Sequence, residues 1–506
     1  MPKRRRVDRP QPAPMETDTV PAAALPDDVL EDILGRLPAR SLAASRLVCK
    51  AWRGLVDERR LLLPHLLPHS VRGLFVNYID HHRPHFFARP MPPADGGPLI
   101  DGEFSFIVRE KPYRWYNVLD HCNGLVLHSG DHFGDNVMYL CNPTTRRWAR
   151  LPPLSDHRHW KRRAFVVFDP AVSPRWEVLL APLEPHTEKS KEEIQPEERT
   201  MEWPPARWAW HVLSSTTMRW EEKVFVRKGG PAGTVSDLLL HSLPDSGNHA
   251  RWRYSAYCQG QLYMHCRGEY VSRLSSSTNK YQVIKSPIDL AECHEGAQSF
   301  IGRSKNGVYF AAVDAEAQLR VWVLNESGHN KMEWLLKHRS VVNPDYEQMR
   351  LDGPWTIDAY NNNYGKSEDE EASHEDNDSE TEEEEASQDD NDSETEGEEV
   401  SQDDSDSETE DDEEPRKDSM EWNSDEDDII GLAKNNTYCS GMCVIILGFH
   451  PYKEVLYLTV MGLWGSRIIA CHLNSTKVQY LGNLNPGCYN RCLYEAFVYT
   501  PCLIGL

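Results

Sequence analysis

One strand-and-turn unit recurs along most of this 506-residue chain. A glycine that follows Asn or Gln precedes a short apolar run three times, at residues 122–128, 258–265 and 305–311. An aromatic residue in a polar turn ends each copy 21 to 27 positions after the glycine, at Trp148, Tyr281 and Trp334, and Trp220 ends a fourth such turn. Asn-Gly between apolar runs is a strong hairpin signal. The pattern therefore predicts repeated antiparallel strands.

A second pair of segments shares another pattern. Residues 168–180 and 449–458 both contain Phe-x-Pro, a turn, and then Glu-Val-Leu. A lone four-stranded sheet leaves its edges and one face exposed, whereas a ring of such sheets covers them. We therefore expect a mainly β chain with a β-propeller of about six to eight blades, at ~40–50 residues per blade. A pair of all-β sandwiches is the alternative.

Residues 25–56, before the strand-rich part, have the spacing of helices instead. One apolar stripe is formed by Leu25, Val29, Leu30, Ile33, Leu34 and Leu37. Pro26, Asp27 and Asp28 suit the first turn of a helix, and Gly35 with Pro38 would end it. Two shorter helices are expected from about Ser41 and from about Val48. A domain below about 40 residues rarely has a core of its own, so we expect this block to need a partner surface.

The helical block resembles the F-box, the module with which F-box proteins bind the Skp-type adaptor of a cullin-based ubiquitin ligase. LPDDVLEDILGRLPARSL followed by LVCKAW carries the resemblance over roughly residues 25–60. It implies adaptor contacts from Leu25, Pro26, Leu30, Ile33, Leu34, Leu37, Pro38, Leu42, Val48, Cys49 and Trp52. The strand-rich part more loosely resembles the F-box-associated, kelch-like propellers of plant F-box proteins. The expected fold is thus a small three-helix F-box followed by the propeller.

An acidic segment, residues 367–428, interrupts the strand pattern. It holds 34 Asp and Glu against 2 Lys and Arg, a net charge of -32, whereas the rest of the chain sums to +8. Few apolar residues and strong self-repulsion predict a disordered insert in the propeller. Glu stands three positions after Ser379, Ser393 and Ser407, which suits phosphorylation by an acid-directed kinase.

The expected domains are therefore a basic, Pro-rich tail (1–22), the F-box (23–66), a first propeller part (70–366), the acidic insert (367–428) and a last propeller part (429–506). The tail contains Lys3, Arg4, Arg5 and Arg6, a run that resembles a nuclear-localisation peptide. No apolar signal region follows it. We expect a nuclear or cytoplasmic protein, without a membrane or nucleic-acid partner.

Patterns of catalysis are missing from the sequence. No GxSxG elbow and no GxxxxGK[ST] phosphate loop occurs. Cys439 with Cys443, and Cys488 with Cys492, have a spacing that zinc could use, but in strands such pairs only share a face. The His81, His82 and His85 group lies in Pro-rich sequence. We therefore expect no metal and no cofactor.

The sequence favours a non-catalytic substrate receptor: the F-box binds the adaptor and through it a cullin, and the propeller binds an unidentified target protein. One alternative is a nuclear protein whose acidic segment binds histones or other basic proteins. Another is a propeller enzyme such as a kelch-type oxidase, which would need a metal or radical site that the scattered Tyr, His and Cys do not indicate.

Overall fold

The fold comes from a computed structural model. It describes residues 25–37, 39–67, 69–78, 83–90, 100–108, 115–132, 135–154, 162–183, 194–240, 254–267, 269–289, 292, 297–326, 332–344, 349, 353–357, 429–430, 443–462, 465–475, 477–484 and 493–504. The expected tail and acidic insert, with Lys3, Arg4, Arg5, Arg6, Ser379, Ser393 and Ser407, lie outside these residues.

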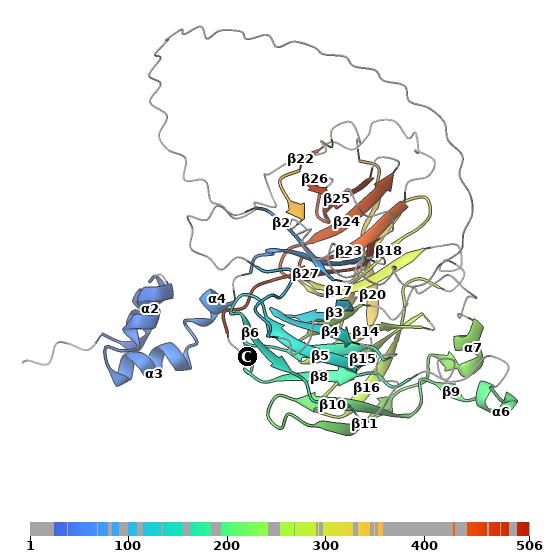
Figure 1. Ribbon diagram of the computed structural model, residues 1–506, viewed down its shortest axis with the longest axis horizontal. Helices are drawn as coiled ribbons and strands as arrows, with labels where there is room; N and C mark the ends of the chain where they lie inside the picture. The colour runs from blue at the N-terminus through green and yellow to red at the C-terminus, as the bar shows by residue number, and fades with distance from the viewer. Residues whose placement is uncertain are drawn as a thin grey trace, which may run out of the picture.

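Antiparallel sheets of four strands dominate the described residues (Figure 1). The first sheet along the chain contains β3 (Trp115–Cys122), β4 (Leu125–His132), β5 (Asp135–Asn142) and β6 (Arg147–Arg150). The second contains β7 (Ala164–Phe168), β8 (Trp176–Leu180), β10 (Arg207–Ser214) and β11 (Trp220–Lys228). The third contains β13 (Ser255–Cys258), β14 (Gln261–Cys266), β15 (Tyr270–Ser275) and β16 (Lys280–Lys285). Outer strands β11 and β16 pair in parallel, which joins the last two into one eight-stranded sheet.

Three further sheets complete the set. The fourth sheet contains β17 (Gln298–Ser304), β18 (Gly307–Val313), β19 (Gln318–Asn325) and β20 (Glu333–Val341). The fifth contains β23 (Cys443–Phe449), β24 (Val455–Gly462), β25 (Gly465–His472) and β26 (Val478–Asn483), with β22 (Ile429–Ile430) at the edge. The sixth contains β27 (Leu493–Tyr499), β1 (Gly73–Tyr78), β2 (His85–Ala88) and β21 (Thr356–Ile357). A small ribbon pairs β9 (Glu202–Trp203) with β12 (Gly233–Thr234), beside α6 (Pro196–Arg199) and α7 (Val235–Leu240).

The sheets are the blades of a closed ring. The innermost strand of each contacts the innermost strand of the next, in the order β3, β7, β13, β17, β23, β27 and back to β3. The described residues therefore form a β-propeller of six blades, within the expected range, and not a pair of sandwiches.

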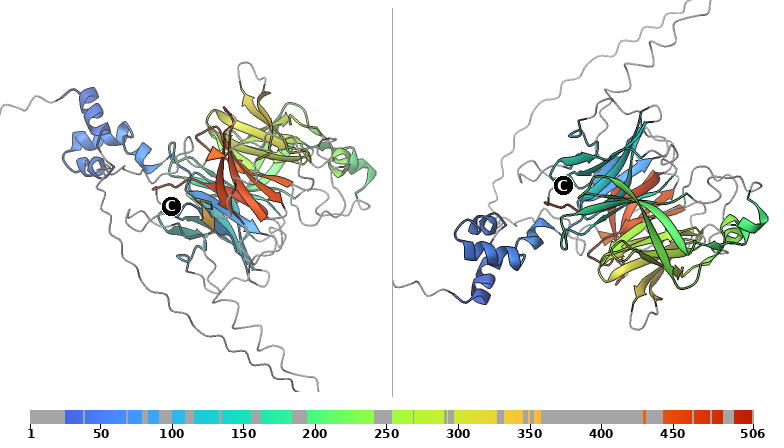
Figure 2. Two further views of the ribbon diagram at one scale, coloured as in Figure 1. Left: turned by 90° about the horizontal axis from the view of Figure 1, so that it is seen from above. Right: turned by 90° about the horizontal axis from the view of Figure 1, so that it is seen from below.

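Strands from both ends of the chain close the ring. β27 pairs antiparallel with β1, from Gly73 opposite Tyr499 onward. Figure 2 shows these N-terminal (blue) and C-terminal (red) strands side by side. Opening the ring would expose the edges of two sheets, so this mixed blade couples the stability of the two ends of the propeller.

The repeated sequence units occupy equivalent places in the blades. Asn123-Gly124 and Gln259-Gly260 form the turns between the first and second strands of their blades, with positive φ at all four residues. The Phe-x-Pro segments make the same hairpin in two other blades, between β7 and β8 and between β23 and β24. The closing aromatics Trp148, Trp220, Tyr281 and Trp334 all lie in outermost strands. One repeat unit is thus one blade.

The predicted helices form a separate unit at one side of the propeller (Figures 1 and 2). They are α1 (Asp27–Gly35), α2 (Ala39–Ser45) and α3 (Lys50–Glu58), followed by the short α4 (Leu63–Leu66). The linker after α3 contacts the propeller: Arg60 donates a hydrogen bond to the carbonyl of Ala171, and His69 stacks on Tyr452 with ring centroids 4.2 Å apart.

The backbone of β26 and the segment just before β21 approach each other closely. A side chain on Gly482, whose φ is +151°, would lie 2.3 Å from the carbonyl oxygen of Trp355. We expect Gly482→Ala to lower the free energy of unfolding by about 1–3 kcal/mol, since the backbone must move to admit the methyl group. Gly307→Ala is the matched control, because its φ is +120° but its surroundings are open. Equal urea-unfolding midpoints for the two variants would contradict the close approach.

Candidate functional site

The helical unit has a small hydrophobic core of its own. Leu30, Leu34, Leu42, Leu55 and Val56 are buried there, with Leu34 1% and Leu42 0% exposed. Leu37, Trp52, Leu61 and Leu62 pack around them. The expectation that so short a block cannot enclose a core is therefore wrong. Three helices that cross one another cover a few leucines even without a large domain.

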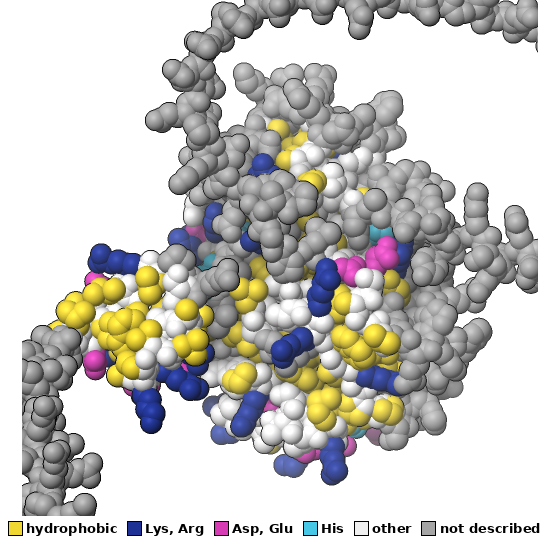
Figure 3. Space-filling model, turned by 60° about the vertical axis from the view of Figure 1, so that its left-hand side comes forward, with side chains coloured by type: hydrophobic (Ala, Val, Ile, Leu, Met, Phe, Trp, Pro, Cys, Tyr) yellow, Lys and Arg dark blue, Asp and Glu magenta, His cyan; other side chains and the backbone are white. Residues whose placement is uncertain are grey.

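A second set of apolar side chains in this unit faces solvent. On α1, Val29 and Ile33 are four residues apart, so they lie along one side of the helix, and Ile33 is 46% exposed. Leu25, just before α1, is 51% exposed. Leu47 and Val48, just before α3, are 88% and 64% exposed. Figure 3 shows hydrophobic side chains gathered over the helical unit. We call these five residues the apolar face.

The residues that the F-box resemblance implies as adaptor contacts therefore fall into two groups. Leu25, Pro26, Ile33, Val48 and Cys49 are exposed and can meet a partner directly. Leu30, Leu34 and Leu42 lie inside the unit's core, while Leu37 and Trp52 are half-buried against it. Pro38 lies outside the described residues. The buried leucines would support the apolar face rather than touch the partner.

Hydrogen bonds and a helix cap position the loop between α2 and α3, which carries part of the apolar face. The backbone N–H groups of Leu47 and Val48 donate to the carbonyls of Ala44 and Ser45 at the end of α2. Cys49 then caps α3, because its sulfur accepts from the backbone N–H of Trp52 at 3.5 Å. Leu47 and Val48 are thereby held outward by a turn between two helices. Sequence reasoning missed Leu47 because it lies outside the helical stripe.

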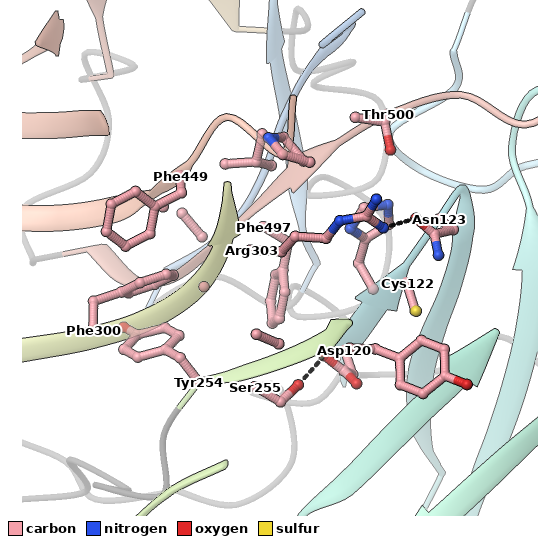
Figure 4. A pocket seen from close by; sticks show the side chains of 18 of the residues that line it. Asp120, Cys122, Asn123, Tyr254, Ser255, Phe300, Arg303, Phe449, Phe497 and Thr500 are labelled. Atoms are coloured by element: carbon pink, nitrogen blue, oxygen red, sulfur yellow. Dashed lines mark hydrogen bonds between the residues drawn. The ribbon is translucent and has the colours of Figure 1, made fainter. Parts of the chain in front are cut away.

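A second candidate site is the central channel of the propeller (Figure 4). It contains a cavity of about 110 Å³ lined by residues from the innermost strands, among them Asp120, Ser255, Phe300 and Phe497, and by Arg163 just before β7. No sequence motif indicated it, because its residues come from strands far apart in the chain. Convergent polar groups inside an apolar ring are typical of binding sites.

The channel holds an unusual concentration of buried charge. Arg163 donates two hydrogen bonds to the Glu495 carboxylate. Asp120 is buried near them, and its Oδ2 accepts from the backbone N–H of Val166 at 2.7 Å. Burial raises the pKa of Asp120 to about 7 and also raises the pKa of Glu495, although Arg163 opposes both shifts. Burial lowers the pKa of His121 to about 4, so this ring is neutral at pH 7.

Asp120 should make the stability of the propeller depend on pH. Its folded pKa is raised above the ordinary value of 3.8, so its contribution is complete below that value and is lost as the pH rises toward about 7. We expect the free energy of unfolding of the parent, relative to Asp120→Asn, to fall by more than about 1 kcal/mol from pH 4 to pH 7.5. Urea unfolding at both pH values measures this, and a constant difference would contradict the buried carboxylate.

The candidate metal ligands of the sequence can be placed only in part. Among the described residues, no three His, Cys, Asp or Glu side chains are close enough to hold an ion. Cys443 is exposed, and the other cysteines of the two spaced pairs, Cys439, Cys488 and Cys492, lie outside those residues. Of the His group, His85 is buried in β2, whereas His81 and His82 are not described.

None of the helices in the described ranges combines the length and apolar character that crossing a bilayer requires.

Comparison with known proteins identifies the domain family of the helical unit. Residues 23–63 match the model of the F-box domain. F-box protein At3g08750 of Arabidopsis thaliana is 28% identical over 144 residues, which cover 27% of this chain and 34% of that protein. F-box/kelch-repeat protein At3g61590 of Arabidopsis thaliana is 32% identical over 139 residues, which cover 26% of this chain and 31% of that protein.

These matches are partial, as the chain spans about a third of the length of these two curated relatives. Among solved structures, "YCF48 bound to D1 peptide" aligns with 54% of this chain and 69% of its own at 8% identity, with a TM-score of 0.24. That similarity is too low to inform the fold or the function. Residues 23–63 are therefore an F-box domain, and the chain as a whole is similar to plant F-box and F-box/kelch-repeat proteins, with a β-rich C-terminal region.

Proposed function

We propose that this chain is the substrate-recognition subunit of a Skp-cullin-F-box ubiquitin ligase. The apolar face of its F-box binds the Skp-type adaptor, which connects the chain to a cullin, and the propeller binds a target protein. The observation that carries the proposal is the apolar face: within a domain that matches the F-box model, these side chains lie on the surface although the unit already has a core.

The energetics of the apolar face fit a protein partner. Burying one aliphatic side chain is worth about 1.5–3 kcal/mol, so five of them would exceed the lower estimates of the free-energy cost of association. Exposed apolar patches on small domains are typical of interaction sites. The adaptor would supply the surface that covers them.

The role of the propeller in this proposal is positional and not catalytic. Holding a target beside a charged conjugating enzyme raises the effective concentration of its lysines, and this accelerates transfer without chemistry in the chain itself. No cofactor, nucleic acid or membrane is part of the proposal. The run Lys3, Arg4, Arg5 and Arg6 would direct part of the protein to the nucleus.

Affinity purification tests the proposal. The tagged full chain, expressed in plant cells, should bring down a Skp-type adaptor and a cullin. A variant without residues 23–63 should bring down neither, and a variant without residues 367–428 should still bring down both. A full chain that purifies without an adaptor would contradict the proposed function.

A further inference from the structure

Two cavities lie on either side of one turn of the propeller. The turn follows β23 and contains Pro451, Tyr452 and Lys453. Pro451 lines the channel cavity of about 110 Å³, and Tyr452 and Lys453 line a second cavity of about 410 Å³. The end of β17 lies beside both, because Arg303 lines the first cavity and Lys305 the second. The two cavities are therefore parts of one surface.

Besides Arg163, which pairs with Glu495, four cations line this surface. Arg303 and Lys305 come from β17 and the turn after it, Lys453 from the turn after β23, and Lys477 from the segment before β26. Lys305 and Lys477 are exposed, while Arg303 and Lys453 are half-buried. We call these four residues the basic rim. Three separate segments thus bring positive charge to one place.

The Arg303 side chain points toward Asn123 in the first cavity. Its Nη1 donates to Asn123 Oδ1 at 3.4 Å (Figure 4). Its guanidinium lies 5.5 Å from the ring centroid of Tyr452. Within the described part of the chain, Arg303 pairs with no carboxylate. A guanidinium held by an amide and an aromatic ring keeps donors available for a planar anion.

The carboxylates that line the same cavities are already engaged. Glu454 accepts from the Tyr309 hydroxyl at 2.7 Å, from Asn306 Nδ2 at 3.0 Å and from Lys337 Nζ at 3.1 Å. Asp120 is buried and accepts from a backbone N–H. Lys337 compensates the charge of Glu454, so Glu454 does not neutralise the basic rim. Among the described residues that line the two cavities, five Lys and Arg side chains thus stand against two carboxylates.

Tyr452, the aromatic residue that lines the second cavity, is engaged as well. The Tyr452 ring stacks on His69 of the F-box linker, and Arg303 lies over it. Single-stranded nucleic acids bind through aromatic side chains that are free to stack on bases. Tyr452 does not offer such a platform, so a polypeptide with negative side chains fits this surface better than a nucleic acid.

We propose that the basic rim binds an acidic segment of a protein, a run of Asp and Glu side chains in extended conformation. This inference rests on the proposed function and deepens it, because it names the chemical class of the target. Arg303 binds one carboxylate through two parallel hydrogen bonds at the first cavity, and the three lysines attract the carboxylates that follow. Specificity lies in charge density more than in shape.

Fluorescence anisotropy with the full chain tests the proposal. The probe is a labelled 14-residue peptide of alternating Asp and Glu, and the control peptide has Asn and Gln at the same positions. The test variant is Arg303→Gln, Lys305→Gln, Lys453→Gln and Lys477→Gln together. The control variant removes the same charge from exposed positions on outer strands or blade rims: Arg147→Gln, Arg207→Gln, Lys228→Gln and Lys280→Gln. The chain's own acidic repeats are the same in every protein compared.

The acidic peptide should bind the parent and the control variant alike, and the test variant about 10- to 100-fold more weakly. Binding to the parent should weaken as salt rises from 0.05 to 0.5 M. The double variant Lys305→Gln, Lys477→Gln, at two exposed positions, should weaken binding about threefold. It replaces the fourfold variant in the test if that variant unfolds.

Three results would overturn the proposal: equal affinity for the two peptides, equal loss in the test and control variants, or tighter binding of a 14-nucleotide oligo(U) that the test variant loses. Adaptor capture by the same proteins is measured in parallel. Peptide binding without adaptor capture would contradict the proposed function alone, and adaptor capture without peptide binding would contradict this inference alone.

Discussion

The double variant Ile33→Asp, Val48→Asp is expected to lose capture of a Skp-type adaptor while the chain stays folded. Both side chains are largely exposed in the isolated chain, so a carboxylate at either position keeps its water there. In a complex the two carboxylates would be desolvated without partners, and two apolar contacts would be lost. Together these effects cost several kcal/mol, so the dissociation constant should rise by more than about 100-fold.

The measurement is calorimetric titration of the full chain with a purified Skp-type adaptor. Val172→Asp is a matched control, because Val172 is an exposed apolar residue of the turn between β7 and β8, outside the helical unit. It should bind the adaptor as the parent does. Adaptor affinity in the double variant within threefold of the parent would show that the apolar face is not the contact surface.

A substitution in the F-box core separates folding from contact. Leu34 is buried beneath the apolar face, so Leu34→Asp would place a charge in the small core and unfold the helices. It would also abolish adaptor capture, but with a loss of helical circular dichroism that the surface variant does not share. Sequence spacing alone could not make this distinction, because Leu34 and Ile33 belong to the same apolar stripe.

The sequence predicted the blades well because each blade is a local structure. Asn123-Gly124 determines a hairpin between neighbouring strands, and Trp148 recurs in the outermost strand of the same blade. Both signals act over fewer than 30 residues, and turn chemistry with alternating apolar residues decides them. The fold class, the number of helices in the F-box and the range of blade numbers followed from such local patterns.

The channel and the mixed blade could not be predicted in the same way. Glu495 meets Arg163 across 332 positions of sequence, and β27 finds β1 at the opposite end of the chain. Nothing in the residues around Glu495 distinguishes it from a solvated carboxylate. The basic rim is hidden for the same reason, since Lys305 and Lys477, which are far apart in the sequence, line one cavity only in the folded propeller. Contacts between residues far apart in the sequence therefore form both the channel and the basic rim.

The buried ion pair in the channel should be the most sensitive electrostatic element of the propeller. Arg163 and Glu495 are 14% and 8% exposed, and their ion pair joins the segment before β7 to β27. Removing one member of a buried pair leaves the other charge without compensation, at a typical cost of about 3–5 kcal/mol. We expect Arg163→Met to lower the free energy of unfolding by that amount at pH 8, as measured by urea denaturation.

The loss in Arg163→Met should depend on pH in a defined direction. Without the guanidinium, the pKa values of Glu495 and Asp120 rise further, since Arg163 lowers both in the parent. Carboxyls with raised folded pKa values contribute fully at low pH and lose that contribution as pH rises, so the variant should lose less stability at pH 5 than at pH 8. Arg163→Met combined with Glu495→Leu should recover much of the loss, because an apolar pair of similar volume leaves no buried charge. A loss below about 1 kcal/mol at both pH values would mean that water, not Arg163, solvates the Glu495 carboxylate, and the channel would then be open to solvent at β27.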